Sequence, residues 1–547
     1  MKHLVNLIEG SIRNNWDIEA LQDYGGESYA YKDVAEQAIK FHQIFENLGI
    51  KKGDKVALLG KNSANWAMAY ILTVTYGAVI VPVLPDFKPG DAHHIINHSD
   101  AKILFADKVI YDKLEFDKMF NLEVVFTLKD FNVLDQRVKD FDAKWSAAAQ
   151  ALEPIMNRGI TPDDFKVKEV QANDLTVISY TSGTTGFSKG VMLSQESLTN
   201  NVLYAQKHMP LNPGDKIVSF LPLAHAYGCA FEFLFPFTYG CHITFLTRTP
   251  SPQIIMRAFA EVRPALILAV PLVIEKIYKN KILPTLKKPM IQALSNIPGV
   301  RSLIYGKIRK QVYEAFGGNF KELIIGGAAF NPDVERFFKT INFPFTVGYG
   351  MTECGPLVSY ASWDTIPMGS CGKPVDALHV RIDSEDPYNE VGEIMIKGSH
   401  VMDGYYKNPE ATAAVLENDG WLHSGDLGIM DENGYVYIKG RSKSMILGPS
   451  GQNIYPEELE AKLNNLQYIQ ESLIVERGNR LTALIYPDYE YIDRRGWDQS
   501  QIEKHLTQDI KHINAEVPNY MQMAKWEIWA EEFEKTPKKS IKRFMYK

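Results

Sequence analysis

A loop rich in glycine and hydroxyl residues is the stretch of this sequence best suited to chemistry. Between Thr181 and Gly190 it contains three glycines and, before Lys189, five Ser or Thr hydroxyls. Glycine allows the backbone to approach a ligand closely, and successive N–H and hydroxyl donors can surround a polyanion that a lysine helps to neutralise. We interpret the loop as a phosphate cradle, although a flexible Gly/Ser/Thr-rich linker has the same composition.

The residues before the loop favour the phosphate interpretation. Val177–Tyr180 is a short β-branched and aromatic run, which predicts a buried strand that leads directly into the loop. Linkers seldom interrupt such an apolar pattern. The spacing is not that of a Walker A loop, because Gly183 and Gly186 are too close together and Lys189 is not followed by Ser or Thr.

Two glycine-rich turns further along the chain suit the rest of a nucleotide. Gly326–Ala328 follows the apolar run Leu323–Ile325, and small residues at a strand end let a flat ring approach the backbone. In VGYGMTECGP, Tyr349 can stack on a base, Thr352 can bond a phosphate and Glu353 can hold Mg²⁺. A tight turn around a buried tyrosine explains the same spacing, so both interpretations stay open.

Three further side chains have a possible role at such a site. Asp426 lies in WLHSGD, Arg441 ends YIKGR, and His225 lies in LPLAHAYG. A carboxylate offers two acceptor oxygens to the two vicinal hydroxyls of a ribose. Each of the three taken alone is more typical of a surface charge or of a packed histidine.

Taken together, these segments resemble the motifs of the adenylate-forming superfamily, which includes acyl-CoA synthetases, peptide-synthetase adenylation domains and luciferases. YTSGTTGFSKG resembles its phosphate loop, GGA and GYGMTE resemble its adenine and metal motifs, and LPLAHAYG resembles the motif whose histidine lies beside the acyl pocket. GRSKSMILGPSGQNIYPEELE resembles its hinge, with Lys443 at the pivot. The resemblance covers essentially the whole chain.

The resemblance implies a set of site residues. Implied ATP-binding residues are Thr181, Ser182, Gly183, Thr184, Thr185, Gly186, Lys189, Gly326, Gly327, Ala328, Gly348, Tyr349, Gly350, Thr352, Asp426 and Arg441. Implied Mg²⁺ ligands are Thr181 and Glu353, and implied catalytic residues are Lys189, Thr352, Glu353, His225 and Lys539.

The resemblance also implies a reaction in two halves. A carboxylate attacks the α-phosphate of ATP and releases pyrophosphate, and the thiol of coenzyme A then attacks the acyl-adenylate. Lys189, Mg²⁺ and the loop donors neutralise the charge that develops on the phosphates. The small carboxyl-terminal domain rotates about Lys443 between the two halves.

The carboxyl-terminal segment EKTPKKSIKRFMYK departs from the family pattern TPxxK[IV]xR. The family's adenylation lysine corresponds to Ser540, which Lys538, Lys539 and Lys542 flank. Our hypothesis is that Lys539 supplies the cation after a register shift of one residue. The alternatives are adenylation without a dedicated lysine, and a basic solvated tail.

Hydrophobic periodicity predicts an α/β fold, and a segment rich in Gly, Ser and Lys divides it into a large domain at residues 1–440 and a small α+β domain at residues 441–547. The resemblance implies that the small domain is a mobile lid. The large domain should contain two doubly wound layers and, after about Trp363, a small antiparallel β subdomain. Helices are expected at Val34–Leu48 and Ala64–Tyr76, and strands at Val56–Leu59, Ala78–Val83, Ile217–Leu221, Ile243–Leu246, Ala265–Val270 and Leu323–Ile325.

Composition excludes other classes of protein. The 547 residues are 45% apolar and carry a net charge of −7 with both signs dispersed, which disfavours a nucleic-acid partner. The four cysteines form no CxxC pair, as in a reduced cytosolic protein, and no segment has the apolar length of a signal peptide or membrane span. We expect a soluble cytoplasmic protein, and leave open peripheral contact with the inner membrane surface and a dimeric state.

We therefore predict an ATP-dependent acid:CoA ligase that forms AMP and pyrophosphate, with ATP, CoA and a fatty acid as partners. FEKTPKKSIKRF and RPALILAVPLVIEKIY most resemble the long-chain acyl-CoA synthetases, although Cys229 stands where some long-chain enzymes are expected to place a gating Trp. The alternatives are an acyl-adenylate or acyl-carrier-protein ligase and, because of Ser540, a non-catalytic nucleotide-binding protein.

Overall fold

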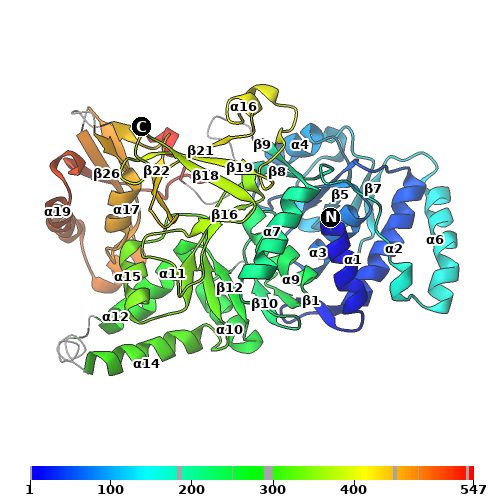
Figure 1. Cartoon of the computed structure of the whole chain (residues 1–547), viewed down its shortest axis with the longest axis horizontal. Helices are drawn as coiled ribbons and strands as arrows, with labels where there is room; N and C mark the ends of the chain where they lie inside the picture. The colour runs from blue at the N-terminus through cyan, green and yellow to red at the C-terminus, as the bar shows by residue number, and fades with distance from the viewer. Residues whose placement is uncertain are drawn as a thin grey trace.

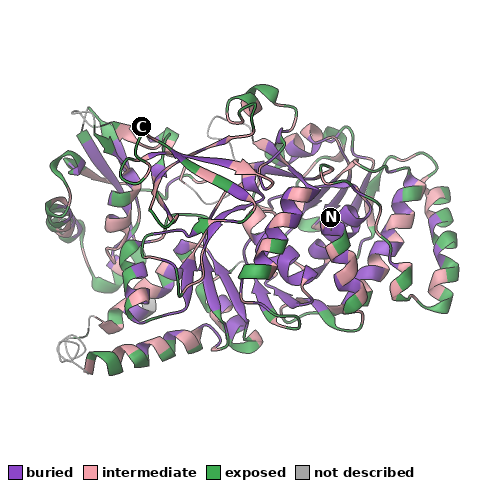
Figure 2. Ribbon diagram, in the orientation of Figure 1, coloured by how far each residue is buried: buried purple, intermediate pink, exposed green. Residues whose placement is uncertain are grey.

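The computed structural model describes residues 3–181, 188–248, 250–286, 288, 300–447, 452–478, 480–536 and 541–546. Figure 1 shows a large mixed α/β body, with the orange and red elements near the carboxyl terminus gathered at one end. The strands of the large body are mostly buried, and exposed residues concentrate on the outer helices (Figure 2). The predicted α/β fold class is confirmed.

The first predicted layer is an eight-stranded sheet in the order β20-β9-β8-β4-β3-β5-β6-β7. Its centre is parallel, and β9 and β7 pair antiparallel toward its edges. Along β3, Val56 and Leu58 face one apolar core while Ala57 and Leu59 face another, because successive strand side chains point to opposite faces. The strands are β3 Lys55–Leu59, β4 Val79–Val83, β5 Ala101–Ala106, β6 Val124–Thr127, β7 Val133–Gln136, β8 Leu175–Thr181, β9 Lys189–Ser194 and β20 Gly404–Tyr405.

Helices cover both faces of this sheet, as a buried parallel sheet requires. Two of them, α2 and α3, match the helices expected from periodicity. The helices of this part are α1 Leu4–Asn14, α2 Tyr31–Leu48, α3 Ala64–Thr75, α4 Pro89–His98, α6 Phe141–Arg158 and α7 Gln195–His208.

The second layer consists of two short sheets, β10-β11-β1-β2 and β12-β13-β14. The predicted strands are present, and β13 ends at the expected residue. The strands β10, β11 and β12 end one or two residues early, because apolar residues continue into turns where ladder pairing has stopped. The sequence did not indicate that β1 pairs in parallel with β11. The strands are β1 Glu19–Asp23, β2 Ser28–Ala30, β10 Lys216–Ser219, β11 His242–Phe245, β12 Leu266–Ala269, β13 Glu322–Ile325 and β14 Phe345–Val347. Nearby helices are α10 Pro252–Val262, α11 Pro271–Ile277, α12 Leu283–Leu286, α14 Val300–Ala315 and α15 Pro332–Thr340.

The predicted antiparallel subdomain is a four-stranded sheet in the order β18-β19-β21-β22. Short strands connect it to the second layer, and the helix α16 lies between β20 and β21 in the sequence. Their bounds are β15 Tyr349–Gly350, β16 Leu357–Tyr360, β17 Lys373–Pro374, β18 Leu378–Asp383, β19 Gly392–Gly398, α16 Pro409–Ala413, β21 Leu422–Met430 and β22 Val436–Arg441.

The carboxyl-terminal elements pack around an apolar core of their own, which contains Leu459, Ile474 and Leu506. An antiparallel pair, β25 and β26, adds β27 in parallel, and helices cover this sheet. The elements are β23 Ile446–Leu447, β24 Asn453–Ile454, α17 Pro456–Asn464, β25 Ile469–Arg477, β26 Arg480–Pro487, α18 Tyr489–Arg495, α19 Gln499–Ala515 and β27 Lys525–Ile528. Within the described ranges, every helix is too short or too polar to cross a membrane.

Candidate active site

The predicted phosphate loop connects the two strands of an antiparallel hairpin, β8 and β9. Thr181, at the end of β8, lies directly opposite Lys189 at the start of β9. A Cβ on Gly190 would lie 2.8 Å from Ile178 Cγ2 and 3.1 Å from the Tyr180 ring, so close packing requires glycine after the lysine. The other predicted loop residues, Ser182, Gly183, Thr184, Thr185 and Gly186, lie outside the described residues.

Tyr405 connects the predicted loop lysine to the predicted metal-binding carboxylate. The Lys189 Nζ lies 4.7 Å from the centroid of the Tyr405 ring, and the Tyr405 hydroxyl donates a 2.9 Å hydrogen bond to Glu353 Oε1. β20 brings Tyr405 there by pairing with β9. Burial, together with the Glu353 carboxylate, raises the pKa of Tyr405, so the phenol stays a donor.

Sequence reasoning missed Tyr405. The only local signal was an aromatic pair, Tyr405 and Tyr406, directly after Gly404. That signal carries no information about a partner as distant in the sequence as Lys189.

The predicted adenine turns lie side by side at the carboxyl ends of two parallel strands. The Gly348 N–H donates to the Ile325 carbonyl at 2.9 Å, which joins the turn after β14 to the end of β13. Gly327 has φ +87, a conformation that glycine adopts readily. A Cβ on Gly326 would lie 3.3 Å from Tyr227 Cζ, so this tyrosine closely backs the turn. Both turns thus lie where ligands bind in open α/β sheets.

Tyr349, Asp426 and Arg441 come together beside these turns. The Tyr349 hydroxyl donates to Asp426 Oδ2 at 2.7 Å, and Arg441 Nε lies 2.9 Å from Asp426 Oδ1. Asp426 and Arg441 are paired residues of β21 and β22. Burial raises the pKa of Asp426, and Arg441 and Tyr349 oppose that shift. The structure therefore places the two predicted ribose residues next to the predicted adenine residue.

The residues predicted to ligate Mg²⁺ have suitable chemistry. In the described part of the chain, no group of three or more His, Cys, Asp or Glu side chains forms a metal site. Mg²⁺ at nucleotide sites typically takes one or two carboxylates and completes its shell with phosphate oxygens and water. The Glu353 carboxylate and the Thr181 hydroxyl, near Lys189 and Tyr405, fit that donor set.

A small apolar cavity of about 20 Å³ lies next to the hairpin. His225, the predicted acyl-pocket histidine, lies in its wall and precedes a helical segment made of Ala226–Gly228, Cys229–Leu234 and Phe235–Thr238. The lining residues come from α3, β4, β8, β9, α7, this helical segment and the turn after Glu353. They are Tyr70, Pro82, Val177, Ser179, Leu193, Leu198, Leu223, Ala224, His225, Ala226, Cys229, Ala230, Leu234 and Gly355.

The predicted hinge and tail are partly described. Lys443 is exposed and follows the end of β22. Lys542, one of the lysines that flank Ser540, forms an ion pair with Glu534 at 2.6 Å. The hydrogen bond from Lys542 lowers the pKa of Glu534, and the charge of Lys88 at the start of α4 adds to this effect, so the tail lies near the large domain. Lys538, Lys539 and Ser540 lie outside the described residues.

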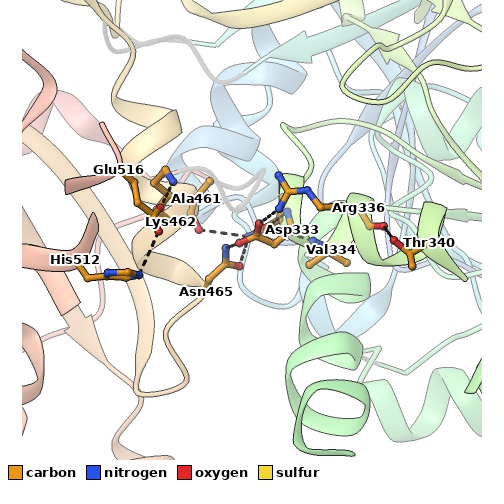
Figure 3. Close-up of polar contacts among 10 residues, drawn as sticks. Asp333, Val334, Arg336, Thr340, Ala461, Lys462, Asn465, His512 and Glu516 are labelled. Atoms are coloured by element: carbon orange, nitrogen blue, oxygen red, sulfur yellow. Dashed lines mark hydrogen bonds and ion pairs between the residues drawn. The ribbon is translucent and has the colours of Figure 1, made fainter. Parts of the chain in front are cut away.

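Polar contacts hold the carboxyl-terminal domain against α15 (Figure 3). Asn331 caps α15 through its side-chain oxygen, and its side-chain nitrogen donates to Asn465 and to the Ala461 carbonyl. Asn465 in turn donates to Asp333 Oδ2 at 2.7 Å. Nearby, Lys462 pairs with Glu516 inside the small domain. These groups form a small polar network between the domains at the end of α17, and Lys279 adds a 2.6 Å hydrogen bond to the Ile469 carbonyl of β25.

Comparison with known protein families identifies the chain. The model described as AMP-binding enzyme matches residues 8–406, and the model described as AMP-binding enzyme C-terminal domain matches residues 443–546. The chain belongs to the AMP-binding enzyme family.

Individual relatives lie at low sequence identity. The long-chain-fatty-acid–CoA ligase of Escherichia coli O6:H1 is 29% identical over 492 residues, which cover 86% of this chain and 82% of that protein. The chloroplastic long-chain-fatty-acid–[acyl-carrier-protein] ligase AEE15 of Arabidopsis thaliana is 26% identical, and the match covers 85% of this chain and 73% of that protein. The crystal structure of the anthranilate CoA ligase AuaEII in complex with anthranoyl-AMP has a TM-score of 0.80 at 19% identity, covering 100% of this chain and 96% of that one. At that identity it shows a shared fold.

We predict that Asn465→Ala weakens the docking of the small domain in this AMP-binding enzyme. The substitution removes hydrogen bonds to Asn331 and Asp333 and leaves the domain cores intact. A net loss of about 1 kcal/mol should raise the undocked population about fivefold. Amide hydrogen exchange in the first turn of α15 measures this change. Lys462→Ala is the control on the same helix, since its partner lies within the small domain; equal exchange in the two variants would contradict the prediction.

We also predict that Tyr405→Phe weakens catalysis by releasing the Glu353 carboxylate. The variant keeps the ring beside Lys189 and removes the hydrogen bond to Glu353. Because a hydrogen bond to a charged group is worth about 1.5–3 kcal/mol, we expect a loss of about tenfold or more in kcat/KM for ATP. The matched control is Tyr406→Phe, whose hydroxyl bonds Asp100 instead. Unchanged kinetics in Tyr405→Phe would refute the role.

Proposed function

We propose that this AMP-binding enzyme is a fatty acid:CoA ligase. It activates the acid with ATP as an acyl-adenylate and transfers the acyl group to CoA, giving acyl-CoA, AMP and pyrophosphate. The observation that carries the proposal is that the apolar cavity and the phosphate hairpin share a strand. Val177 and Ser179 of β8 line the cavity, and the same strand ends at Thr181 opposite Lys189. This lining would have to open to admit an acyl chain, whose carboxylate would then lie beside the phosphates.

The residues around the hairpin would perform the first half-reaction. Lys189 and the donors of residues 181–186 would hold the β- and γ-phosphates, and Thr181 and Glu353 would hold Mg²⁺, which neutralises phosphate charge when bound. Thr352 would bond a phosphate and His225 would face the reacting carboxylate. Gly355 lines the cavity close to Glu353, so the metal position and the acyl wall lie on one turn.

The nucleoside would bind at the paired turns. In this proposal Tyr349 packs against adenine, and Asp426 and Arg441 bind the ribose. The small residues around the adenine would let its ring approach the backbone closely. They are Gly326, Gly327, Ala328, Gly348 and Gly350. The hydrogen bond from Tyr349 to Asp426 supports this assignment, because it aligns both groups before ligand arrives.

The second half-reaction would use movement of the small domain. We assign residues 1–440 to the ATP and acyl domain and residues 441–547 to the lid, with Lys443 at the hinge. The docking network around Asn331 and Asn465 is compatible with such movement, since its polar groups can exchange their partners for water.

The acid is proposed to be a long-chain fatty acid. Two observations support this class: the cavity wall is dominated by aliphatic side chains, and the E. coli relative bears the name of a long-chain ligase. A carrier-protein thiol in place of CoA is the second candidate, favoured by the name of the Arabidopsis relative. Both candidates share the adenylation step and differ only in the acceptor.

The decisive assay is pyrophosphate release from ATP with palmitate, octanoate or acetate, each with CoA, with acyl-carrier protein or with neither. We expect multiple turnovers that need CoA and favour palmitate. Lys189→Ala should lower the rate about a hundredfold or more, since it removes a fixed charge at the phosphates. Lys407→Ala is the control, because this nearby lysine pairs with Asp100. Turnover with carrier protein alone would establish the second candidate, and no pyrophosphate with any acid would favour a nucleotide-binding protein.

The position of the lysines around Ser540 predicts that Lys538 and Lys539 differ in their effect on adenylation. If Lys539 supplies the adenylation cation in place of Ser540, Lys539→Ala should slow single-turnover pyrophosphate release about a hundredfold, while Lys538→Ala should not. Lys542 is already held by Glu534, which leaves it a weaker candidate. Equal, near-normal rates in Lys539→Ala and Lys538→Ala would contradict the hypothesis.

A further inference from the structure

The turn between β10 and His225 is held by two side chains from other parts of the chain. It runs from Ser219, the last residue of β10, to the predicted acyl-pocket histidine. Beyond Ser219 the backbone leaves the sheet but stays partly buried, so its polar groups need partners other than a strand ladder. Asn62 and Glu232 provide most of these partners.

Asn62 holds the turn from the connection between β3 and α3. Its side-chain nitrogen donates to the Leu221 carbonyl at 2.7 Å, and its side-chain oxygen accepts from the Leu223 N–H at 2.9 Å. One amide thus satisfies an acceptor and a donor of the turn at the same time. Asn62 is half-buried and precedes Ser63, which caps α3. The turn is therefore tied to the start of a buried helix of the first layer.

Glu232 holds the same turn from the helical segment that follows His225. One of its carboxyl oxygens accepts from the Phe220 and Leu221 N–H groups, both at 2.9 Å, and from Ser219 Oγ at 3.0 Å. The side chain is fully buried. Burial raises the pKa of Glu232 well above its ordinary value, although these hydrogen bonds oppose that shift. The turn uses an acceptor oxygen, which a neutral amide can also supply.

Backbone contacts on both sides of His225 complete this arrangement. The His225 N–H donates to the Pro222 carbonyl at 3.0 Å, and the Cys229 N–H donates to the His225 carbonyl at 2.9 Å. A Cβ on Gly228 would lie 2.7 Å from the Pro222 carbonyl oxygen, so the helical segment packs directly on the turn. The histidine backbone is thus fixed before any ligand arrives, as a group that acts on a reacting carboxylate requires.

We propose that Asn62 and Glu232 are positioning residues, which fix the His225 backbone so that its side chain stays beside the reacting carboxyl group during adenylation. This inference rests on the proposed function, in which His225 faces that group. Asn62 and Glu232 act through the turn and contact no substrate. Loss of either anchor lets the turn shift, and a displacement of about 1 Å at a reacting group can slow a reaction about a hundredfold.

A double-mutant cycle tests the proposal, with single-turnover pyrophosphate release at saturating ATP and saturating acid as the readout. We expect Asn62→Ala to slow this step about ten- to hundredfold and to leave KM for ATP unchanged. In a His225→Ala enzyme, which has already lost the positioned side chain, Asn62→Ala should have almost no further effect. Equal effects of Asn62→Ala in both backgrounds, or a native rate in His225→Ala, would overturn the proposal.

Asn65→Ala is the matched control, because this nearby asparagine donates to the Lys129 carbonyl at 2.9 Å instead of to the turn. It should keep the native rate. Glu232→Gln retains an acceptor oxygen and should also keep the native rate, whereas Glu232→Leu removes it and should slow adenylation as Asn62→Ala does. A Glu232→Gln enzyme as slow as Glu232→Leu would refute the acceptor role of Glu232.

Amide hydrogen exchange measures the hold on the turn without reference to activity. The His225 N–H keeps its own partner, the Pro222 carbonyl, in Asn62→Ala, so faster exchange there would show that the turn has loosened. Unchanged exchange would overturn the hold. Pyrophosphate release with additive effects of Asn62→Ala and His225→Ala would overturn the positioning role alone and leave the ligase intact. Absence of pyrophosphate with every acid would overturn both the ligase and a positioning role in adenylation.

Discussion

Electrostatic repulsion between a carboxylate and a triphosphate is the constraint on which the rest of this structure depends. Both reactants are anions, so their site has to present cations and donors in fixed positions before they meet. In the proposed site the β8–β9 hairpin has this role, with Lys189 opposite Thr181 where the strands leave the sheet. The other groups are arranged around it. Residues of β8 also line the apolar cavity, and β20, which carries Tyr405, pairs with β9.

Pairing of buried polar groups gives the site its rigidity. Asp426 is held between Tyr349 and Arg441, and Glu353 accepts from Tyr405. Such contacts are stronger away from bulk water, and they keep each group oriented in the absence of ligand.

The small domain is stabilised mainly by its own apolar core, whereas polar contacts attach it to the large domain. It has its own apolar core around Leu459 and Leu506, and the contacts from Asn465 to α15 are polar. A domain with a complete core does not need its neighbour in order to stay folded, and polar contacts can exchange with water. The same physical arrangement is compatible with both docking and the proposed movement about Lys443.

The sequence by itself determined the class of fold, most strands and the order of the nucleotide motifs. These features are local: strand periodicity, glycine-rich turns such as Gly326–Ala328 and charged residues at strand ends are visible in short windows. The sequence does not define the ends of strands sharply, because apolar residues continue past the last ladder pair, as after β10. Only the tertiary structure decided that β1 pairs with β11, that Tyr405 stands between Lys189 and Glu353, and that Asn62 holds the turn before His225. Those contacts join residues far apart in the chain, and packing in three dimensions, which leaves no local pattern, selects them.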